Sequence, residues 1–406
     1  MNNDPANASW RRALRILLSV QFIISAAFSI VPPVIPLLLP ELGIVQPESI
    51  SVWAGLVMGV TPLAAGLMSP VWGRLVDSLD RRNIILVACG AACICTLLMS
   101  VATNAWQLVA LRMLMGFFGG HIVAVMALVS SSSPPDRLGW ALGWLSTAQL
   151  AGMLLGPLFG GLIADTLDSY RAPFVAGGLA SLLVALLVLW LPKQAPPPRD
   201  TKHVRESTIA VASRYPALRA VICILLLAQF AVTSAQPIVA LYVQQLVGPV
   251  QNLATLAGIA FSVIGVSGLL AAPLLGRAGD STGAVTLLWV VLAGAAALTF
   301  VQSFAPGYSW FLGERFAAGL FLAGVMPLAN SLVAREVAAA DRGRAFGLTG
   351  SATFLGAFIG PLSGGYISAH LGMPRVFQFA GIALLCAALV LYLIARGGRA
   401  SSENEA

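Results

Sequence analysis

Twelve long apolar segments run through this 406-residue sequence and restrict its fold more than any other feature. A helix needs roughly 20 predominantly apolar residues to cross a bilayer. Only 10% of the residues are charged, whereas soluble domains carry about 25%. The sequence therefore predicts an all-α integral membrane protein of twelve transmembrane helices. The expected spans are 15–38, 51–73, 84–103, 107–129, 140–163, 172–191, 217–243, 253–275, 284–303, 308–333, 344–367 and 376–395.

The positive charges indicate the topology. If the N-terminus is cytoplasmic, 19 of the 23 Lys and Arg residues lie on cytoplasmic segments or within the first three residues of the spans that begin there. The remaining four are Arg171 and Arg375 outside and Arg112 and Arg315 within spans. This distribution follows the positive-inside rule. The net charge of +7 thus reports topology, with both termini cytoplasmic, and indicates no nucleic-acid partner.

The two halves of the chain repeat each other. Residues 69–78, SPVWGRLVDS, match 272–281, APLLGRAGDS. The glycine-rich stretch 152–161 recurs as 356–365, with a Gly-Pro pair and a Gly-Gly pair in matching places. Two parallel repeats of six helices place a substrate site where the repeats meet, near the middle of the bilayer.

The repeat predicts two pseudo-symmetric six-helix bundles. The first covers 1–191 and the second 217–406, including a short cytoplasmic tail. A polar, proline-containing segment at 192–216 is expected to be a cytoplasmic linker. Asp136, before the fifth span, corresponds to Asp341, before the eleventh.

The glycine-rich stretch predicts close helix packing. Gly152, Gly156 and Gly160 recur every four residues and share one face of a helix. In lipid, such a stripe lets a neighbouring backbone approach closely. Pro157 removes a backbone donor and predicts a bend. The packing and bend residues are Gly152, Gly156, Pro157, Gly160, Gly161, Gly360 and Pro361.

These motifs resemble those of the major facilitator superfamily over nearly the whole chain. Gly73–Arg82 is similar to that family's loop motif between spans two and three, although Asp80 stands where the motif usually has Gly. Arg112 is similar to its fourth-span arginine, and Gly152–Gly161 to the fifth-span motif of proton-driven exporters. The overall pattern is most similar to bacterial twelve-span drug–proton antiporters. This resemblance implies a multidrug exporter of the bacterial inner membrane that alternates access by rocking its halves.

The same resemblance implies a gate at the cytoplasmic end of the second span. Asp77 would face the start of the eleventh span, and Asp280 the start of the fifth. A carboxylate is favourable near a helix N-terminus. Ordinary loop charge is the alternative interpretation. The gating candidates are Gly73, Asp77, Arg81, Gly276 and Asp280.

Two ionisable residues within spans are candidates for proton coupling. Of 16 carboxylates, only Glu314 lies well inside an apolar span. An ionisable group at that depth is expensive and marks a functional site by default. The alternative is a carboxylate solvated or paired near the outer mouth. Arg112 acquires a coupling role from the family resemblance, with a structural hydrogen-bonding role as the alternative.

Polar stripes on several spans predict the lining of a central cavity. The alternative is hydrogen bonding between helices, worth about 0.6 kcal/mol per contact. The expected cavity is mostly uncharged, which favours an amphiphilic or neutral solute. The cavity candidates are Gln21, Ser25, Gln149, Gln229, Thr233, Gln236, Arg315, Phe354 and Phe358.

The sequence contains no nucleotide-binding loop, metal-spaced histidine cluster or nucleophile elbow. We therefore expect no enzyme, no metal and no cofactor, with the proton gradient as the energy source. The expected partners are a small-molecule substrate, protons and the lipid bilayer, with the chain working as a monomer. A sugar or other metabolite transporter of the same fold is the alternative function. A non-transporting membrane sensor is a more remote alternative, since it would need an appended soluble domain or a large loop.

Overall fold

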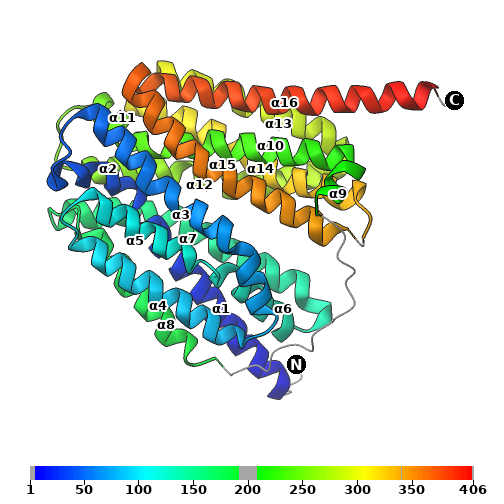
Figure 1. Cartoon of the computed structure of the whole chain (residues 1–406), viewed down its shortest axis with the longest axis horizontal. Coiled ribbons are helices and arrows are strands. Elements are labelled where there is room, and N and C mark those ends of the chain that lie inside the picture. Colours follow the sequence, from blue (N-terminus) through cyan, green and yellow to red (C-terminus); the bar gives the residue numbers. More distant parts are fainter. Residues whose placement is uncertain (1–4, 192–207, 340, 405–406) are drawn as a thin grey trace. The chain divides into compact units, whose positions relative to one another are not determined.

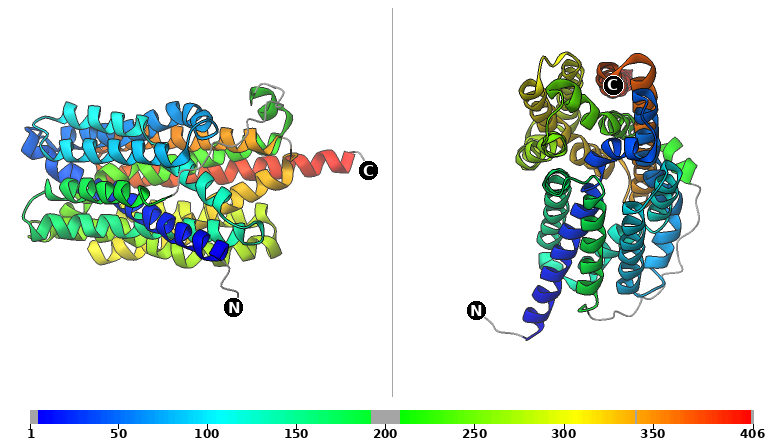
Figure 2. Two further views of the ribbon diagram at one scale, coloured as in Figure 1. Left: turned by 90° about the horizontal axis from the view of Figure 1, so that it is seen from below. Right: turned by 90° about the vertical axis from the view of Figure 1, so that its left-hand side faces the viewer.

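A computed structural model describes residues 5–191, 208–339 and 341–404, and Figures 1 and 2 show its helices. Within these ranges, every regular element is an α-helix or a 3-10 helix, which confirms the all-α prediction. Eleven helical segments of the described chain are long and apolar enough to cross a membrane. A twelfth apolar helix, α8 (Ala172–Val188), is shorter. These twelve segments coincide with the twelve predicted spans.

Contacts divide the chain into two compact units. Unit 1 comprises the described parts of Met1–Ile44, Leu63–Lys202 and Val250–Ser262, and unit 2 those of Val45–Pro62, His203–Pro249 and Val263–Ala406. The predicted division at 1–191 and 217–406 follows the sequence repeat. The division by contacts differs from it, because it assigns the start of one helix of each repeat to the unit formed mainly by the other repeat. The first half of α3 (Pro47–Val76) packs in unit 2, and the first third of α12 (Leu253–Thr282) packs in unit 1.

Unit 1 is a helical bundle whose first span is interrupted by prolines. Its other elements are α1 (Pro5–Ser29), η1 (Pro32–Val34), α2 (Ile35–Leu38), η2 (Leu39–Leu42), α4 (Arg81–Ser100), α5 (Ala105–Phe117), α6 (His121–Ser132), η3 (Pro135–Arg137), α7 (Leu138–Thr166) and α8. The first span, expected over 15–38, is therefore not one helix. Pro32 and Pro33 follow the end of α1 and lack the N–H groups that would continue its hydrogen bonding.

The fourth span is also divided. It was expected as one helix over 107–129, but α5 ends before a turn that leads into α6. A side chain on Gly120 at this turn would collide with the Trp72 ring. The Trp72 indole N–H donates to the last carbonyl of α5 at 2.7 Å, so a backbone group freed by the break is satisfied. His121 begins α6 and stacks on Phe28, with ring centroids 5.1 Å apart.

Unit 2 repeats this organisation. Its other elements are α9 (Thr208–Arg214), α10 (Pro216–Ser234), η4 (Gln236–Ile238), α11 (Val239–Val247), α13 (Ala284–Val301), η5 (Gln302–Phe304), α14 (Tyr308–Glu336), α15 (Arg342–Leu371) and α16 (Met373–Asn404). Figure 1 shows α10, α13 and α16 side by side. The seventh span breaks at Pro237, which corresponds to Pro33 in the first. Helix α9 belongs to the predicted linker, of which 192–207 lies outside the described residues.

The two cores use equivalent helix faces. Leu17, Val20 and Ile24 of α1 are buried in unit 1, and α10 buries apolar residues at the same spacing in unit 2. Residues three, four and seven apart share one face of a helix. The exposed faces are apolar as well, as Leu182 and Leu186 of α8 illustrate. Helices that are apolar all round are typical of membrane spans.

Candidate functional site

The glycine stripe of α7 lies against α1. A side chain on Gly152 or Gly156 would collide with atoms of α1, and one on Gly160 with Ile30, the residue that follows α1. The Ser29 hydroxyl of α1 donates to the Gly152 carbonyl at 3.2 Å. Close backbone approach through small residues is a common way for helices to associate in lipid. The stripe therefore fastens the fifth span to the first.

The second copy of the stripe does the same in unit 2. A side chain on Gly356, Gly360 or Gly364 of α15 would collide with atoms of α10. Thr233 takes the place of Ser29, since its hydroxyl lies 2.8 Å from the Gln229 carbonyl and 3.3 Å from the Gly356 carbonyl. The eleventh span is thus fastened to the seventh by equivalent contacts.

Part of the predicted cavity lining takes part in these helix contacts. Gln21 and Ser25 are buried in unit 1, and the Gln21 amide donates to the Ser25 hydroxyl at 3.3 Å. Thr233 is buried in unit 2. The other polar and aromatic candidates are half-buried: Gln149, Gln229, Gln236, Phe354 and Phe358. The contacts show helix packing for Ser25 and Thr233, and a role in a cavity stays a prediction for the whole set.

A groove of about 500 Å³ runs along α1 and α7 within unit 1. Its lining contains the hydroxyls of Ser19 and Thr147 and no charged side chain among the described residues. Its volume falls in the range of small-molecule sites, about 300–1,000 Å³. None of the predicted cavity residues lines it. The lining residues are Leu18, Ser19, Phe22, Ile23, Trp144, Thr147, Ala148 and Ala151.

The two arginines within spans are interior residues of their units. Arg112 on α5 is 6% exposed, and Arg315 on α14 is 5% exposed. The Arg315 guanidinium lies 5.3 Å from the centroid of the Phe311 ring, within the distance of a cation–π contact. An arginine keeps its charge at this depth and needs protein or water around it. Arg315 therefore lies inside unit 2, and its proposed contact with a substrate stays a prediction.

Glu314 is half-buried on α14 beside a cluster of aromatic rings. Its Oε2 atom is buried and has no hydrogen-bond partner among the described atoms. Phe311 lies one turn earlier on the same helix, and its ring packs with those of Tyr242 and Phe377, with centroids 5.1 to 5.6 Å apart. An unpartnered buried carboxylate is costly, whereas the protonated form carries no charge. The surroundings of Glu314 are therefore compatible with a bound proton.

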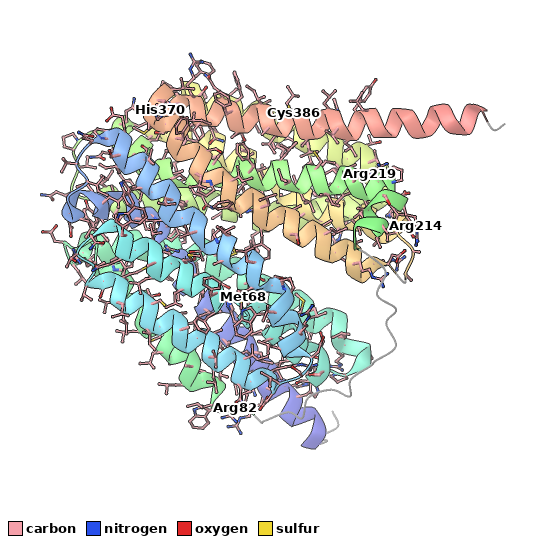
Figure 3. All side chains as sticks on the ribbon, viewed as in Figure 1. Met68, Arg82, Arg214, Arg219, His370 and Cys386 are labelled. Carbon is pink, nitrogen blue, oxygen red and sulfur yellow. The ribbon has the colours of Figure 1, made fainter. Side chains whose placement is uncertain are left out.

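The loop motif between α3 and α4 is built into unit 1. Asp80 caps α4 and accepts from the Arg82 backbone N–H at 3.0 Å, which gives the unusual residue of the motif a structural role. Arg81 donates to the Ala127 carbonyl at 3.1 Å and to the Ser131 hydroxyl at 2.7 Å. The Arg82 guanidinium, labelled in Figure 3, donates to the carbonyl that follows α8 at 2.9 Å. The arginines thus bind the C-terminal ends of α6 and α8, where cations are favourable.

The gating prediction stays a prediction. Asp77 follows the last residue of α3 and is exposed. A side chain on Gly73 would meet no described atom within 4 Å. Gly276 and Asp280 lie on α12, but their side chains lie outside the described residues. Asp77 and its expected partner α15 belong to different units.

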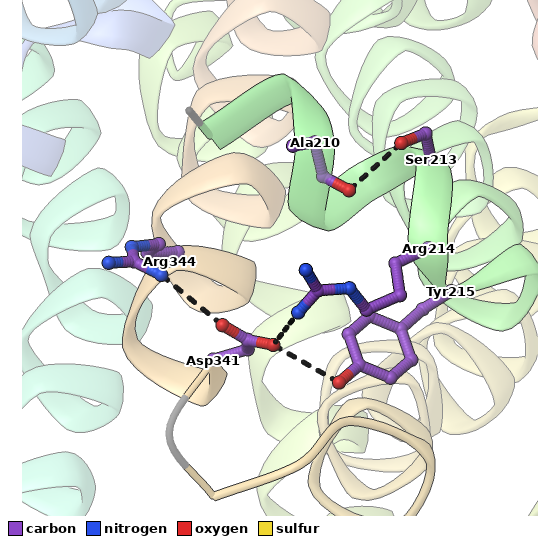
Figure 4. A network of polar contacts seen from close by, with 6 residues as sticks. All are labelled: Ala210, Ser213, Arg214, Tyr215, Asp341 and Arg344. Carbon is purple, nitrogen blue, oxygen red and sulfur yellow. Dashed lines mark hydrogen bonds and ion pairs between the residues drawn. The ribbon is translucent and has the colours of Figure 1, made fainter. Parts of the chain in front are cut away.

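Sequence reasoning missed the network around Asp341. This carboxylate accepts from Arg214 at 3.2 Å, Tyr215 at 3.1 Å and Arg344 at 3.2 Å (Figure 4). The network joins the linker helix α9 to the start of α15. The corresponding Asp136 is exposed and pairs with its sequence neighbour at 3.7 Å. The repeat marked both aspartates, but no sequence signal distinguished the buried one.

A second missed residue is Asp165, near the end of α7. Its carboxylate accepts from the backbone N–H of Ala254 at 3.2 Å and of Thr255 at 2.6 Å, at the start of α12. Farther along these helices, the Ser262 hydroxyl donates to the Leu154 carbonyl at 2.6 Å. In the sequence, Asp165 was one of several acids at span ends, and its partners lie about 90 positions away.

Twelve spans in two repeated sets, with ionisable residues inside the spans, define a multi-pass membrane carrier. The chain belongs to the Major Facilitator Superfamily, whose profile matches residues 17–301 and 249–406. The family resemblance seen in the sequence is confirmed. Proteins of this family are transporters and not enzymes, in agreement with the sequence-based prediction.

Relatives of known name match the chain from end to end. The multidrug resistance protein MdtG of Proteus mirabilis (strain HI4320) is 33% identical over 383 residues, which is 93% of this chain and 94% of that protein. MdtG of Citrobacter koseri is 36% identical over 389 residues, 95% of each chain. A solved bacterial homologue of the human lysosomal transporter Spinster has the same fold, with a TM-score of 0.77, 15% identity and coverage of 97% of this chain and 98% of that one.

Proposed function

We propose that the protein exports small amphiphilic or neutral molecules across the bacterial inner membrane in exchange for protons. The observation that carries this proposal is the end-to-end similarity to relatives named multidrug resistance proteins. The uncharged groove along α1 and α7 supports an uncharged or amphiphilic substrate. A charged group that enters such a site loses hydration without gaining a charged partner.

Proton coupling is assigned to Glu314, with Arg112 as the second candidate. The buried, unpartnered Oε2 of Glu314 among the described atoms supports this assignment. Binding a proton removes the charge, and releasing it restores the charge, so the cost of burying the group depends on its protonation. A carboxyl group whose burial changes during the cycle would therefore bind and release a proton once per cycle.

The proposal also covers the topology, the oligomeric state, the energy source and the transport cycle. Both termini are cytoplasmic, which the distribution of Lys and Arg supports. The single chain is the working unit, and no bound cofactor is needed because the proton gradient supplies the energy. Access alternates between the two sides of the membrane, as the twofold repeat of six spans favours.

Transport in proteoliposomes with an imposed pH gradient tests the proposal. The wild type is expected to move a fluorescent amphiphile in response to the gradient. Glu314→Gln is expected to reduce this transport to the rate measured without a gradient, while exchange of labelled for unlabelled substrate continues. Glu336→Gln is the matched control, because Glu336 is exposed at the other end of the same helix.

Two results would contradict parts of this proposal. A Glu314→Gln variant that still responds to the gradient would exclude Glu314 as the proton carrier. A wild type that moves labelled sugars or amino acids but no amphiphile would support the metabolite transporter instead.

A further inference from the structure

The Asp165 carboxylate binds free backbone N–H groups at the start of α12. The first backbone N–H groups of an α-helix have no acceptor within the helix. Ala254 and Thr255 follow the first residue of α12, and both donate to the Asp165 carboxylate. Negative charge at this position also complements the helix dipole.

This contact closes one end of a longer seam within unit 1. We call it the α7–α12 seam; it consists of Leu154, Pro157, Gly161 and Asp165 on α7 and Ala254, Thr255, Gly258 and Ser262 on α12. Its residues recur at intervals of about four, so they share one face of each helix. A side chain on Gly161 would collide with the Ala254 carbonyl, and one on Gly258 with the Pro157 carbonyl. The seam joins a helix of the first repeat to a helix of the second.

We propose that Asp165 is a positioning residue of the transport cycle, which holds the α7–α12 seam closed and releases α12 when access changes sides. This inference rests on the alternating access proposed above, because a change of access separates helices of the two repeats. The predicted topology places Asp165 at the outer membrane surface. Water there can replace the carboxylate on the freed N–H groups, so the contact opens without leaving buried polar groups unpaired.

The charges around Asp165 leave its carboxylate available to α12. Arg171, the cation nearest in sequence, pairs with Glu41 at 3.2 Å and donates at 2.9 Å to each of two backbone carbonyls near the end of α4. Burial and the negative charges of Asp165, Glu41 and Asp168 raise the pKa of Tyr170. Asp165 therefore lies in an acidic neighbourhood, and its described hydrogen-bond donors come from α12.

The reactivity of a cysteine introduced at Ala254, one of the two residues that Asp165 binds, tests the proposal. Ala254 is completely buried, so an Ala254→Cys reporter reacts with a membrane-impermeant thiol reagent added outside only when the seam opens. Asp165→Asn in this background is expected to react roughly tenfold faster, because one neutral amide oxygen replaces two charged acceptors and the negative charge that complements the helix dipole is lost. Asp165→Glu, which keeps both carboxylate oxygens and the charge, is expected to remain within about twofold of the parent. The protein without the reporter measures the background from native cysteines.

Asp168→Asn is the matched control. It removes the same charge three residues away, and no described hydrogen bond joins Asp168 to α12. Equal reaction rates for Asp165→Asn and Asp168→Asn would overturn the proposal. If Asp165→Asn does not fold, Asp165→Ser replaces it, because serine keeps a capping oxygen without the charge. The assay needs no substrate, so it reports on the seam even if the wild type fails to export amphiphiles.

Discussion

The α7–α12 seam of unit 1 has a counterpart in unit 2, formed by α15 and the first half of α3. Both seams bring backbone against backbone through glycine and proline. A side chain on Gly258 would collide with the Pro157 carbonyl, and one on Gly55 with the Pro361 carbonyl. Gly365 lies against the Ser51 carbonyl, as Gly161 lies against that of Ala254. The repeat has kept the backbone packing of the two seams.

The polar contacts at the ends of the seams differ. The α7–α12 seam ends on the carboxylate of Asp165, whereas in the α15–α3 seam the hydroxyls of Ser51 and Ser368 lie 3.0 Å apart. The position that corresponds to Asp165 is Ala369. The starting points of the helices explain the difference. Helix α12 begins at the seam, whereas α3 begins at Pro47, so Ser51 is one turn inside its helix and its N–H is already used.

Leucine at the seam glycines tests whether both seams must close. We expect Gly161→Leu and Gly365→Leu to lower stability by about 1–3 kcal/mol each, the usual cost of overpacking, and to slow transport strongly. Melting temperature in detergent and transport in proteoliposomes measure the two effects. Gly143→Leu on α7 and Gly350→Leu on α15 are matched controls, because a side chain at either position would meet no described atom within 4 Å. If leucine at a seam glycine lowers neither the melting temperature nor the transport rate, that seam is not closed in the native protein.

An aspartate at Ala369 tests the explanation for the difference. If α3 offers no free N–H group there, Ala369→Asp should lower stability by about 1 kcal/mol, since the new polar group lacks a partner. The melting temperature of Ala369→Asn serves as the control for side-chain size. An increase in stability for Ala369→Asp alone would show that α3 does offer donors and that the starting points of the helices do not explain the asymmetry.

Removal of the hydroxyl pair should have the smallest effect. Ser51→Ala is expected to cost about 0.6 kcal/mol, the average for a hydrogen bond between helices in a membrane. Its effect should be smaller than that of Asp165→Asn, because hydrogen bonds to charged groups are stronger. Ser49→Ala, near the start of the same helix, is the control. A loss for Ser51→Ala as large as that for Asp165→Asn would remove the proposed difference between the seams.

Much of the fold could be predicted from local sequence patterns. Apolar length identified the spans, and the glycines of 152–161 and 356–365 indicated close packing before their neighbours were known. The breaks in the first and seventh spans were marked by Pro33 and Pro237, but the prediction treated each span as continuous. The division of the fourth span depends on Trp72 packing against Gly120, which is a tertiary contact.

The partners of the polar side chains were harder to predict than the fold. Ser25 and Thr233 had the spacing of a cavity lining, but the structure places them against the glycines of a neighbouring helix. Asp165 and Asp341 gave no sequence signal that set them apart from other acids at span ends. Their donors include Thr255 and Arg214, which lie 90 and 127 positions away.

The sequence by itself determined that this chain is a twofold-repeated bundle of membrane helices. Lipid offers no hydrogen bonds to the backbone, so a long apolar segment must satisfy its own polar groups as a helix. Only the tertiary structure decided which polar side chains join those helices. A carboxylate such as Asp165 needs free N–H groups within about 3 Å, and their position depends on where a distant helix begins.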